Sequence, residues 1–257
     1  MLLVSVFVKF NPWGRMGNRM FQYAFGYLLA NQKGVPLYTE GLPNFNIPPT
    51  PYSIIETPCI ETIQYGNNHV NYEELLKCDK NIVINSFVQK ALYYKAFRNK
   101  LRTAFNIIPK QVINSNKLVL HIRETDYKDI GCFLGYENYK KLIDQIGLNE
   151  VIVVTDNSNC DTVQMLLKDG CTLNTQGYVD KFDTVSDDRA MNDFYTLLYS
   201  ENIAISQSSF SWWAAFLGFH KKVYFPYIGQ VSIWKVQPEK DDIDLFYFSE
   251  ETHKLVL

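Results

Sequence analysis

A run of apolar residues ends in a group of polar side chains that could hold a phosphate. The run Leu118–Ile122 is typical of a buried strand, and it delivers His121, Arg123 and Asp126 near its carboxyl end. In open α/β sheets, ligands bind at this edge. The planar guanidinium of Arg123 suits a diphosphate, because it forms two parallel charge-assisted hydrogen bonds and keeps its proton. The alternative is a structural ion pair between Arg123 and Asp126.

Two further segments contain the glycines and hydroxyls that anion sites use. Gly14–Tyr23 follows the first apolar run, and its backbone amides could face an anion at the start of a helix. The segment has neither the GK[ST] of a phosphate-binding loop nor GxGxxG, so a plain strand-to-helix turn is equally compatible with it. After a later apolar run, Ser208 and Ser209 could cap a helix while facing a phosphate. They could also form an ordinary cap, with Trp212 and Trp213 in the core.

Apolar runs and helical patterns alternate along the chain. The predicted strands are Leu2–Val8, Ile82–Ile84, Leu118–Ile122, Val151–Thr155, Ile203–Ser206 and Val223–Phe225. The predicted helices are Asn18–Ala30, Tyr136–Ile146, Asp161–Lys168, Asp188–Tyr199 and Ser211–Phe219. This alternation predicts an α/β fold with parallel sheets and helices on both faces.

Two stretches interrupt the alternation. Gly41–Asn71 is rich in Pro, Asn, Thr and Tyr, has little periodicity, and predicts loops over the first sheet. In Ile108–Lys117, Pro109 and a polar Asn-Ser-Asn stretch precede the next strand. We place a domain boundary there, which predicts one domain over residues 1–110 and another over residues 111–257.

Composition excludes several classes of protein. The net charge is −2, with 25 basic and 27 acidic residues, which gives no electrostatic footprint for nucleic acid. The five cysteines have no CxxC spacing, so reduced thiols are expected. The apolar start, Met1–Phe10, is too short to span a bilayer and lacks a basic leader. We therefore expect no integral membrane segment and a cytoplasmic protein, free or peripheral to the membrane.

The three polar segments together resemble a family, the metal-independent fucosyltransferases of the α-1,2 type, which are related to the α-1,6 and protein O-fucosyltransferases. The matching residues are Gly14-Arg15-Met16-Gly17-Asn18, His121-Ile122-Arg123-Glu124-Thr125-Asp126-Tyr127 and Ser206-Gln207-Ser208-Ser209-Phe210-Ser211-Trp212-Trp213. The resemblance implies a GT-B architecture, with two facing Rossmann-like domains, the acceptor side in the first and the donor in the second. It also implies inverting transfer of fucose from GDP-fucose to a glycan, α-1,2 to galactose, in the making of a surface glycan.

The resemblance also implies roles for single residues. Arg123 matches the donor-phosphate arginine, and His121 matches a histidine beside the nucleotide. Asp193 matches the aspartate that reads guanine, a suitable role because a carboxylate can accept two hydrogen bonds from that base edge. The remaining matches are Ser208, Ser209 and Phe210 around the diphosphate, and Gly17 and Asn18 in a loop of the first domain that closes over the donor.

One position departs from the family pattern HxRRxDY. Glu124 stands where a second arginine is usual, and a carboxylate beside a diphosphate is unfavourable. Glu124 is therefore expected to point away, or to meet a different donor or acceptor group. Two alternatives stay open: a transferase of the same architecture that uses another nucleotide sugar, and a non-catalytic carbohydrate-binding protein with Tyr and Trp as stacking platforms.

The sequence does not single out a catalytic base. Asp126 is the first candidate because it lies beside Arg123, although an arginine-paired carboxylate is a poor base, and Glu40 and Asp129 are weaker candidates. We expect neither a metal nor a cofactor besides the donor. Asp242-Ile243-Asp244 formally fits the DxD pattern, but it lies in a charged stretch typical of a solvated surface. Fixed positive groups would then stabilise the charge that develops on the diphosphate.

Overall fold

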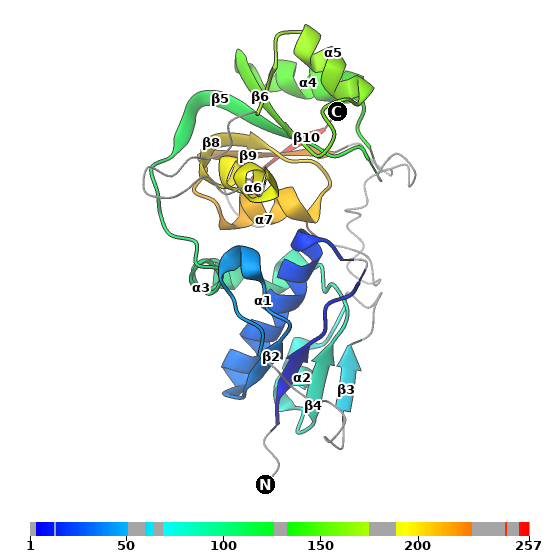
Figure 1. Ribbon diagram of the computed structural model, residues 1–257, viewed down its shortest axis with the longest axis vertical. Coiled ribbons are helices and arrows are strands. Elements are labelled where there is room, and N and C mark those ends of the chain that lie inside the picture. The colour runs from blue at the N-terminus through cyan, green and yellow to red at the C-terminus, as the bar shows by residue number, and fades with distance from the viewer. Residues whose placement is uncertain are drawn as a thin grey trace. The chain divides into compact units, whose positions relative to one another are not determined.

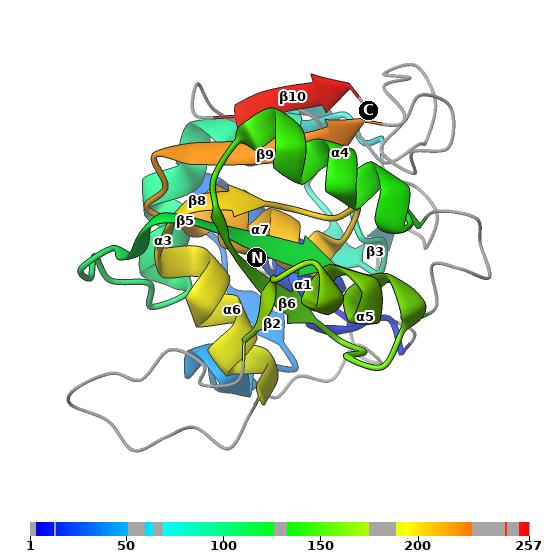
Figure 2. The same ribbon diagram turned by 90° about the horizontal axis from the view of Figure 1, so that it is seen from above.

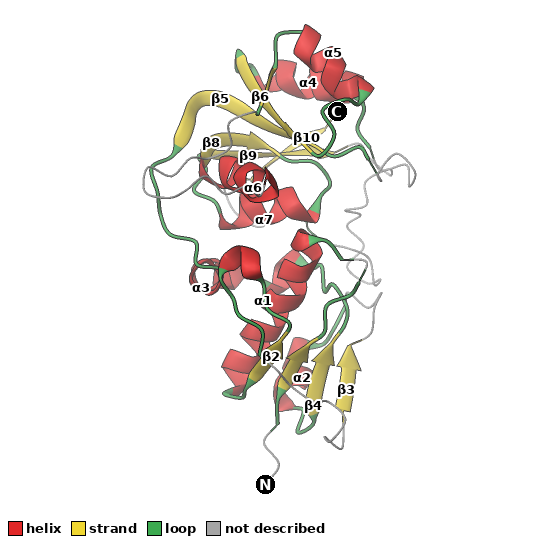
Figure 3. Ribbon diagram, viewed as in Figure 1, coloured by secondary structure: helices red, strands yellow, loops and turns green. Residues whose placement is uncertain are grey.

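The chain folds into two compact units, each built from strands and helices (Figure 3). The computed structural model describes residues 4–12, 14–50, 60–63, 69–125, 133–174, 189–227, 245 and 252–256. The first unit contains the described residues up to Ile108 together with Leu245, and the second contains the others, beginning at Pro109.

The first unit is built on a four-stranded parallel sheet (Figure 1). Its strands are β1 (Val6–Val8), β2 (Leu37–Thr39), β3 (Ile60–Ile63) and β4 (Asn81–Ile84), in the order β2-β1-β4-β3. Its helices are α1 (Met16–Lys33), α2 (Tyr72–Lys77) and α3 (Arg98–Ala104), with short 3₁₀ turns η1 (Pro43–Phe45), η2 (Ala91–Tyr93) and η3 (Lys95–Phe97). The helix α1 ends at Gly34, whose φ of 66° is the left-handed conformation that glycine adopts without strain.

The second unit is built on a six-stranded parallel sheet (Figure 2). Its strands are β5 (Ile113–Ile122), β6 (Glu150–Thr155), β7 (Thr172–Leu173), β8 (Ser200–Ala204), β9 (Lys222–Tyr227) and β10 (Thr252–Val256). The spatial order is β7-β6-β5-β8-β9-β10, which is the 3-2-1-4-5-6 order of the Rossmann sheet. In such a sheet the direction of winding reverses between the first and fourth strands. Here these are β5 and β8, so the crevice at their carboxyl ends is where a ligand is expected.

Helices cover both faces of this second sheet. They are α4 (Tyr136–Ile146), α5 (Asp161–Lys168), α6 (Arg189–Tyr199) and α7 (Ser209–Leu217), with α4 and α5 on one face and α6 and α7 on the other (Figure 1). On the first face, Leu118, Leu120 and Ile122 of β5 pack with buried residues of α4 and α5. Because successive side chains of a strand alternate between faces, His121 lies on the opposite face, where it contacts α7.

Three helices lie at their predicted positions. The helices α4 and α5 begin and end where the sequence places them, and α1 extends the predicted Asn18–Ala30 by a few residues at each end. Each predicted run within the described residues overlaps a strand, although β8 ends at Ala204, two residues before the end of the predicted run Ile203–Ser206. The predicted α/β fold with parallel sheets is confirmed.

Three local predictions were wrong. The stretch Gly41–Asn71, predicted as loops, contains β3. The helix predicted over Ser211–Phe219 lies two residues earlier along the chain, because Ser208 caps it. The polar Asn-Ser-Asn stretch belongs to β5, where Asn114 and Asn116 adopt φ values of 54° and 64°. The pairing of β5 with β8 shifts register across these asparagines, which tolerate the left-handed conformation better than most residues do.

Among the described residues, no helix combines the length and the apolar character needed to cross a bilayer.

Candidate functional site

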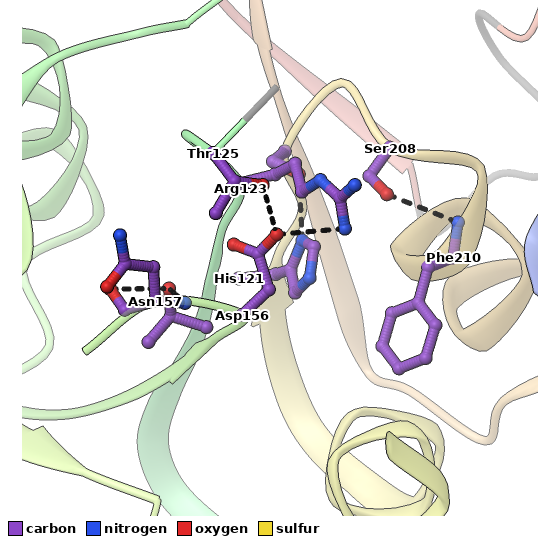
Figure 4. A network of polar contacts seen from close by, with 9 residues as sticks. His121, Arg123, Thr125, Asp156, Asn157, Ser208 and Phe210 are labelled. Atoms are coloured by element: carbon purple, nitrogen blue, oxygen red, sulfur yellow. Dashed lines mark hydrogen bonds and ion pairs between the residues drawn. The ribbon is translucent and has the colours of Figure 1, made fainter. Parts of the chain in front are cut away.

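The carboxyl ends of β5 and β6 bring an arginine and an aspartate together. These strands pair in parallel up to Ile122 and Thr155, so the residues that follow, Arg123 and Asp156, come out side by side. The Nη1 atom of Arg123 lies 3.0 Å from Oδ2 of Asp156 (Figure 4). The same Oδ2 accepts a hydrogen bond of 2.6 Å from the hydroxyl of Thr125. Arg123 is therefore held in a defined orientation, and its side chain is 13% exposed.

Sequence reasoning missed Asp156 as the partner of Arg123. The structural alternative to phosphate binding was an ion pair with Asp126, which lies outside the described residues. An ion pair of that kind exists, but its carboxylate comes from the neighbouring strand. The signal was present, because Asp156 directly follows the predicted strand Val151–Thr155, as Arg123 follows its own strand.

His121 is neutral and buried beside the arginine. It is 4% exposed, its Nδ1 lies 2.7 Å from the hydroxyl oxygen of Ser206, and its ring stacks on Phe210 with centroids 5.5 Å apart. Burial, assisted by the charge of Arg123, lowers the pKa of His121 to about 3. The imidazole can therefore donate one hydrogen bond and accept another, but it adds no positive charge at neutral pH.

The serine-rich turn caps α7. The hydroxyl of Ser208 accepts a hydrogen bond of 3.3 Å from the amide of Phe210, which makes Ser208 the N-cap residue. The hydroxyl of Ser211 donates to the carbonyl oxygens of Ser206 and Ser208, at 3.3 and 3.2 Å. Trp212 and Trp213 are fully buried, and Ser209 and Phe210 are partly exposed. The features of an ordinary helix cap are thus all present.

A capped helix N-terminus can still attract an anion. The aligned peptide dipoles place a partial positive charge at the start of α7. In Figure 4, the side chain of Arg123 extends from the end of β5 towards the turn that holds Ser208. A guanidinium and a helix N-terminus therefore lie at the switch point of the sheet. This arrangement has the chemistry that binds a phosphate or diphosphate.

Asp193 is a buried carboxylate on α6 that is linked to the same region. The side-chain amide of Asn174 donates to its Oδ1 at 2.8 Å. Burial raises the pKa of Asp193, while the hydrogen bond from Asn174 and the charge of Arg189 act in the opposite direction. The next residue, Phe194, meets Phe210 edge to face at 5.5 Å. A chain of ring contacts therefore connects α6 to Phe210 and His121.

Glu124 lies on the other side of β5. It is 1% exposed, and neither carboxylate oxygen has a hydrogen-bond partner among the described residues. Burial raises the pKa of the Tyr139 phenol on α4, and the charge of Glu124 adds to that effect. Glu124 therefore faces the core beneath α4, and Asp156 is the carboxylate beside Arg123.

The predicted residues of the first unit lie in a helix. The helix α1 begins at Met16, so Gly17, predicted in a loop, and Asn18, predicted to begin the helix, both lie in its first turn. Asn18 accepts a hydrogen bond of 2.9 Å from the side chain of Gln89. The side chain of Gln22 ties down the preceding segment, because it accepts from the amide of Asn11 and donates to the carbonyl of Lys9. The role of Gly17 and Asn18 towards a donor stays a prediction.

The candidate bases and metal ligands are mostly outside the described residues. Asp126, Asp129 and the Asp242-Ile243-Asp244 segment all lie there. Glu40 is exposed and directly follows β2 in the first unit. Within the described ranges, no group of three or more His, Cys, Asp or Glu residues could hold a metal ion. The catalytic base and the independence from metal stay predictions.

The chain has the fold of GT-B type, with two α/β units that are each built on a sheet of parallel strands. Solved structures with such a fold are similar to it. One is a mutant of Arabidopsis thaliana FUT1 in complex with GDP, with 10% identity, 91% of this chain and 72% of that chain covered, and a TM-score of 0.54. Two structures of POFUT1, in complex with GDP and in the apo form, have 11% identity, cover 82% of this chain and 94% of those chains, and give TM-scores of 0.39 and 0.36. No protein-family model matches the sequence, and no curated protein matches it.

Proposed function

We propose that the chain is an inverting glycosyltransferase that moves fucose from GDP-fucose to a glycan hydroxyl, α-1,2 to galactose. The observation that carries the proposal is the position of Arg123, fixed by Asp156 at the switch point beside the start of α7. The fold is shared with FUT1, a fucosyltransferase whose structure contains GDP, and this similarity supports the choice of donor.

Charge stabilisation is the main chemical task in such a transfer. The acceptor oxygen forms a bond to the anomeric carbon while the bond from that carbon to the phosphate oxygen breaks, and GDP leaves with the electron pair. The acceptor hydroxyl gives up its proton to a base, for which Asp126 is the first candidate. Negative charge grows on the diphosphate as the bond breaks, and the guanidinium of Arg123 and the amides of α7 can stabilise it from fixed positions. His121 can contribute a hydrogen bond but no charge, since it is neutral.

The guanine of the donor would be recognised by Asp193. Its carboxylate can accept hydrogen bonds from the two N–H groups on one edge of guanine, and adenine presents no such pair there. Asn174 fixes the carboxylate with a bond to Oδ1. In this proposal Phe210 lies beside the diphosphate, where it shields the buried His121 from water.

The proposal includes transfer without a metal ion, in the cytoplasm, as a step in making a surface glycan. Fixed positive groups take the part that a divalent cation takes in other transferases. Activity that persists in EDTA supports this part of the proposal, and activity that returns only with added Mg²⁺ or Mn²⁺ contradicts it.

A donor screen with the purified chain tests the proposed reaction. GDP-fucose, GDP-mannose and UDP-galactose are each incubated with lactose and with N-acetyllactosamine, and the products are analysed for linkage. We expect a product with GDP-fucose alone, carrying fucose on O2 of galactose. Turnover with another donor favours a different sugar specificity, and tight GDP binding with no transfer favours a non-catalytic protein.

A further inference from the structure

The first unit contains a pocket that the proposed transfer site does not use. It has a volume of about 580 Å³ and lies where α2, the end of α1 and the segment 90–97 meet. Pockets that bind small ligands typically have volumes of roughly 300–1,000 Å³. Its lining includes an aromatic wall, defined by Tyr72, Tyr93 and Phe97, together with Leu92, which is 66% exposed.

The aromatic wall is held in place by contacts of its own. The rings of Tyr72 and Tyr93 stack with centroids 6.4 Å apart, and the buried Phe25 meets both edge-on, at 5.5 and 5.3 Å. The hydroxyl of Tyr93 donates to the carbonyl of Val70 at 3.0 Å and accepts from its amide at 2.8 Å. A ligand that stacks on this wall therefore loses little free energy to ordering it.

The same lining also contains polar residues. Gln32 and Asn71 carry amides, His69 an imidazole, Glu73 a carboxylate and Lys90 an ammonium group. Lys90 is only 4% exposed whereas Glu73 is exposed, so this set does not favour a phosphate or another polyanion. It does offer both donors and acceptors of hydrogen bonds.

We propose that this pocket is a saccharide-binding site that holds one sugar ring of a glycan. A pyranose has a face of C–H groups, which suits an aromatic wall, and a rim of hydroxyls, which suits the amides and the Glu73 carboxylate. The inference rests on the proposed function in one respect, that the protein acts on a glycan. The pocket belongs to the first unit, whereas Arg123 belongs to the second.

Binding to a glycan array tests the site directly. The fluorescently labelled chain is applied without donor, and the best-bound oligosaccharide is then titrated in solution. We expect Phe97→Ala and Leu92→Asn each to weaken the binding of that oligosaccharide about 10-fold, the loss expected when an apolar stacking contact is removed. The matched control is Met165→Asn on α5 of the second unit, a side chain that is 42% exposed, which should bind as the parent does.

Leu92→Asn keeps the test valid even if Phe97→Ala fails to fold, because Leu92 is mostly outside the core. No binding to any glycan on the array, or equal weakening by Met165→Asn, overturns the proposal.

Parallel measurements separate this site from the proposed reaction. We expect Leu92→Asn to bind GDP as the parent does and Arg123→Lys to bind the oligosaccharide as the parent does. If Leu92→Asn weakens oligosaccharide binding but the parent protein transfers no fucose, the saccharide site is supported and the proposed reaction is contradicted. If the parent protein transfers fucose but neither pocket variant changes the affinity for the oligosaccharide, the proposed reaction is supported and the saccharide site is contradicted.

Discussion

At the scale of single residues, the proposed chemistry depends on the shape of one guanidinium. Arg123 can present two parallel N–H groups to a diphosphate while Asp156 holds its Nη1. A lysine at this position would carry the same charge as a compact point on a flexible stem. The geometry of the charge, more than its presence, is what the site provides.

The exchange of Arg123 for lysine tests this claim. We expect Arg123→Lys to lower kcat/KM for GDP-fucose by about 100-fold or more, as when a donor to a developing anion is removed. Steady-state kinetics with fixed acceptor measure the loss. Arg102→Lys on α3 is the matched control, since Arg102 is a half-buried arginine of the first unit whose described bond goes to Asn99. If the Arg123→Lys variant keeps kcat/KM within a few-fold of the parent, Arg123 does not have its assigned role.

Asp156 is expected to act through Arg123 as a positioning residue. Asp156→Ala removes the ion pair and the acceptor for Thr125, so the guanidinium loses its fixed direction. We expect kcat to fall about 10-fold, because effective orientation is lost, with a smaller change in KM. Asp156→Glu, which restores a carboxylate, should recover part of kcat. A change in thermal stability alone, with kcat as in the parent, would mean that Asp156 serves the fold and not the reaction.

His121 makes the stability of the second unit sensitive to acid. Its pKa is lowered from 6.5 to about 3, so the unfolded chain binds a proton at a higher pH than the folded chain does. The stabilisation is complete above about pH 6.5 and is lost as the pH falls towards 3, by roughly 1.4 kcal/mol per pH unit. Urea denaturation at pH 7, 6 and 5 measures the slope. His121→Gln, which cannot titrate, should show a smaller loss, and equal slopes in both proteins would contradict the expectation.

The sequence could place His121, Arg123 and Ser208 in one region because polar residues at the carboxyl ends of parallel strands meet at one edge of a sheet. It could not identify Asp156 as the partner of Arg123, because that choice depends on the register between β5 and β6. The contact between Asn174 and Asp193 was equally hidden, since Asn174 follows a strand of two residues that gives no periodic signal.

At the scale of elements, length decided what could be predicted. The helices α4 and α5 have one apolar face over two or more turns, and the sequence gives their bounds. The strands β2 and β7 are three and two residues long, too short for a pattern to be distinguished from a loop. The asparagines in β5 predict a turn by type, and pairing with β8 on both sides of them makes them part of the strand.

The contact of α1 with its sheet depends on Gly26. A Cβ atom at this position would lie 2.3 Å from Cγ2 of Val8 on β1. Gly26→Ala gains about 1 kcal/mol of helix propensity but overpacks the interface, which typically costs 1–3 kcal/mol. We expect the free energy of unfolding to fall by about 1 kcal/mol, measured by urea denaturation.

The double variant provides the control for this clash. Val8→Ala removes the methyl group that a Cβ at position 26 would meet, so Gly26→Ala should be neutral or stabilising in that background. Additive effects of the two changes would show that the loss in Gly26→Ala does not come from a clash with Val8.

At the scale of the whole molecule, two sheets of parallel strands and a nearly neutral net charge explain how an anion would be held. With a net charge of −2, the chain has no general attraction for a nucleotide, so binding depends on local groups at one sheet edge. The order of the second sheet makes β5 and β8 the strands that border the crevice. The fold class followed from the alternation of strands and helices, and the choice between the two sheets as the ligand-binding one followed from Arg123 and the serine turn.

Hydrogen exchange in the presence of GDP tests which of the two units binds the nucleotide. In the proposed function GDP binds only the folded site, so a concentration of 100 Kd is expected to stabilise that site by about 2.7 kcal/mol. We expect slower amide exchange in peptides that cover the end of β5, α6 and the first turn of α7, with little change in β1 and β4. The same protection should appear in EDTA and disappear in Arg123→Lys. Protection that requires Mg²⁺, or that is confined to the first unit, would place the nucleotide elsewhere, because a ligand slows exchange most where its binding suppresses local opening.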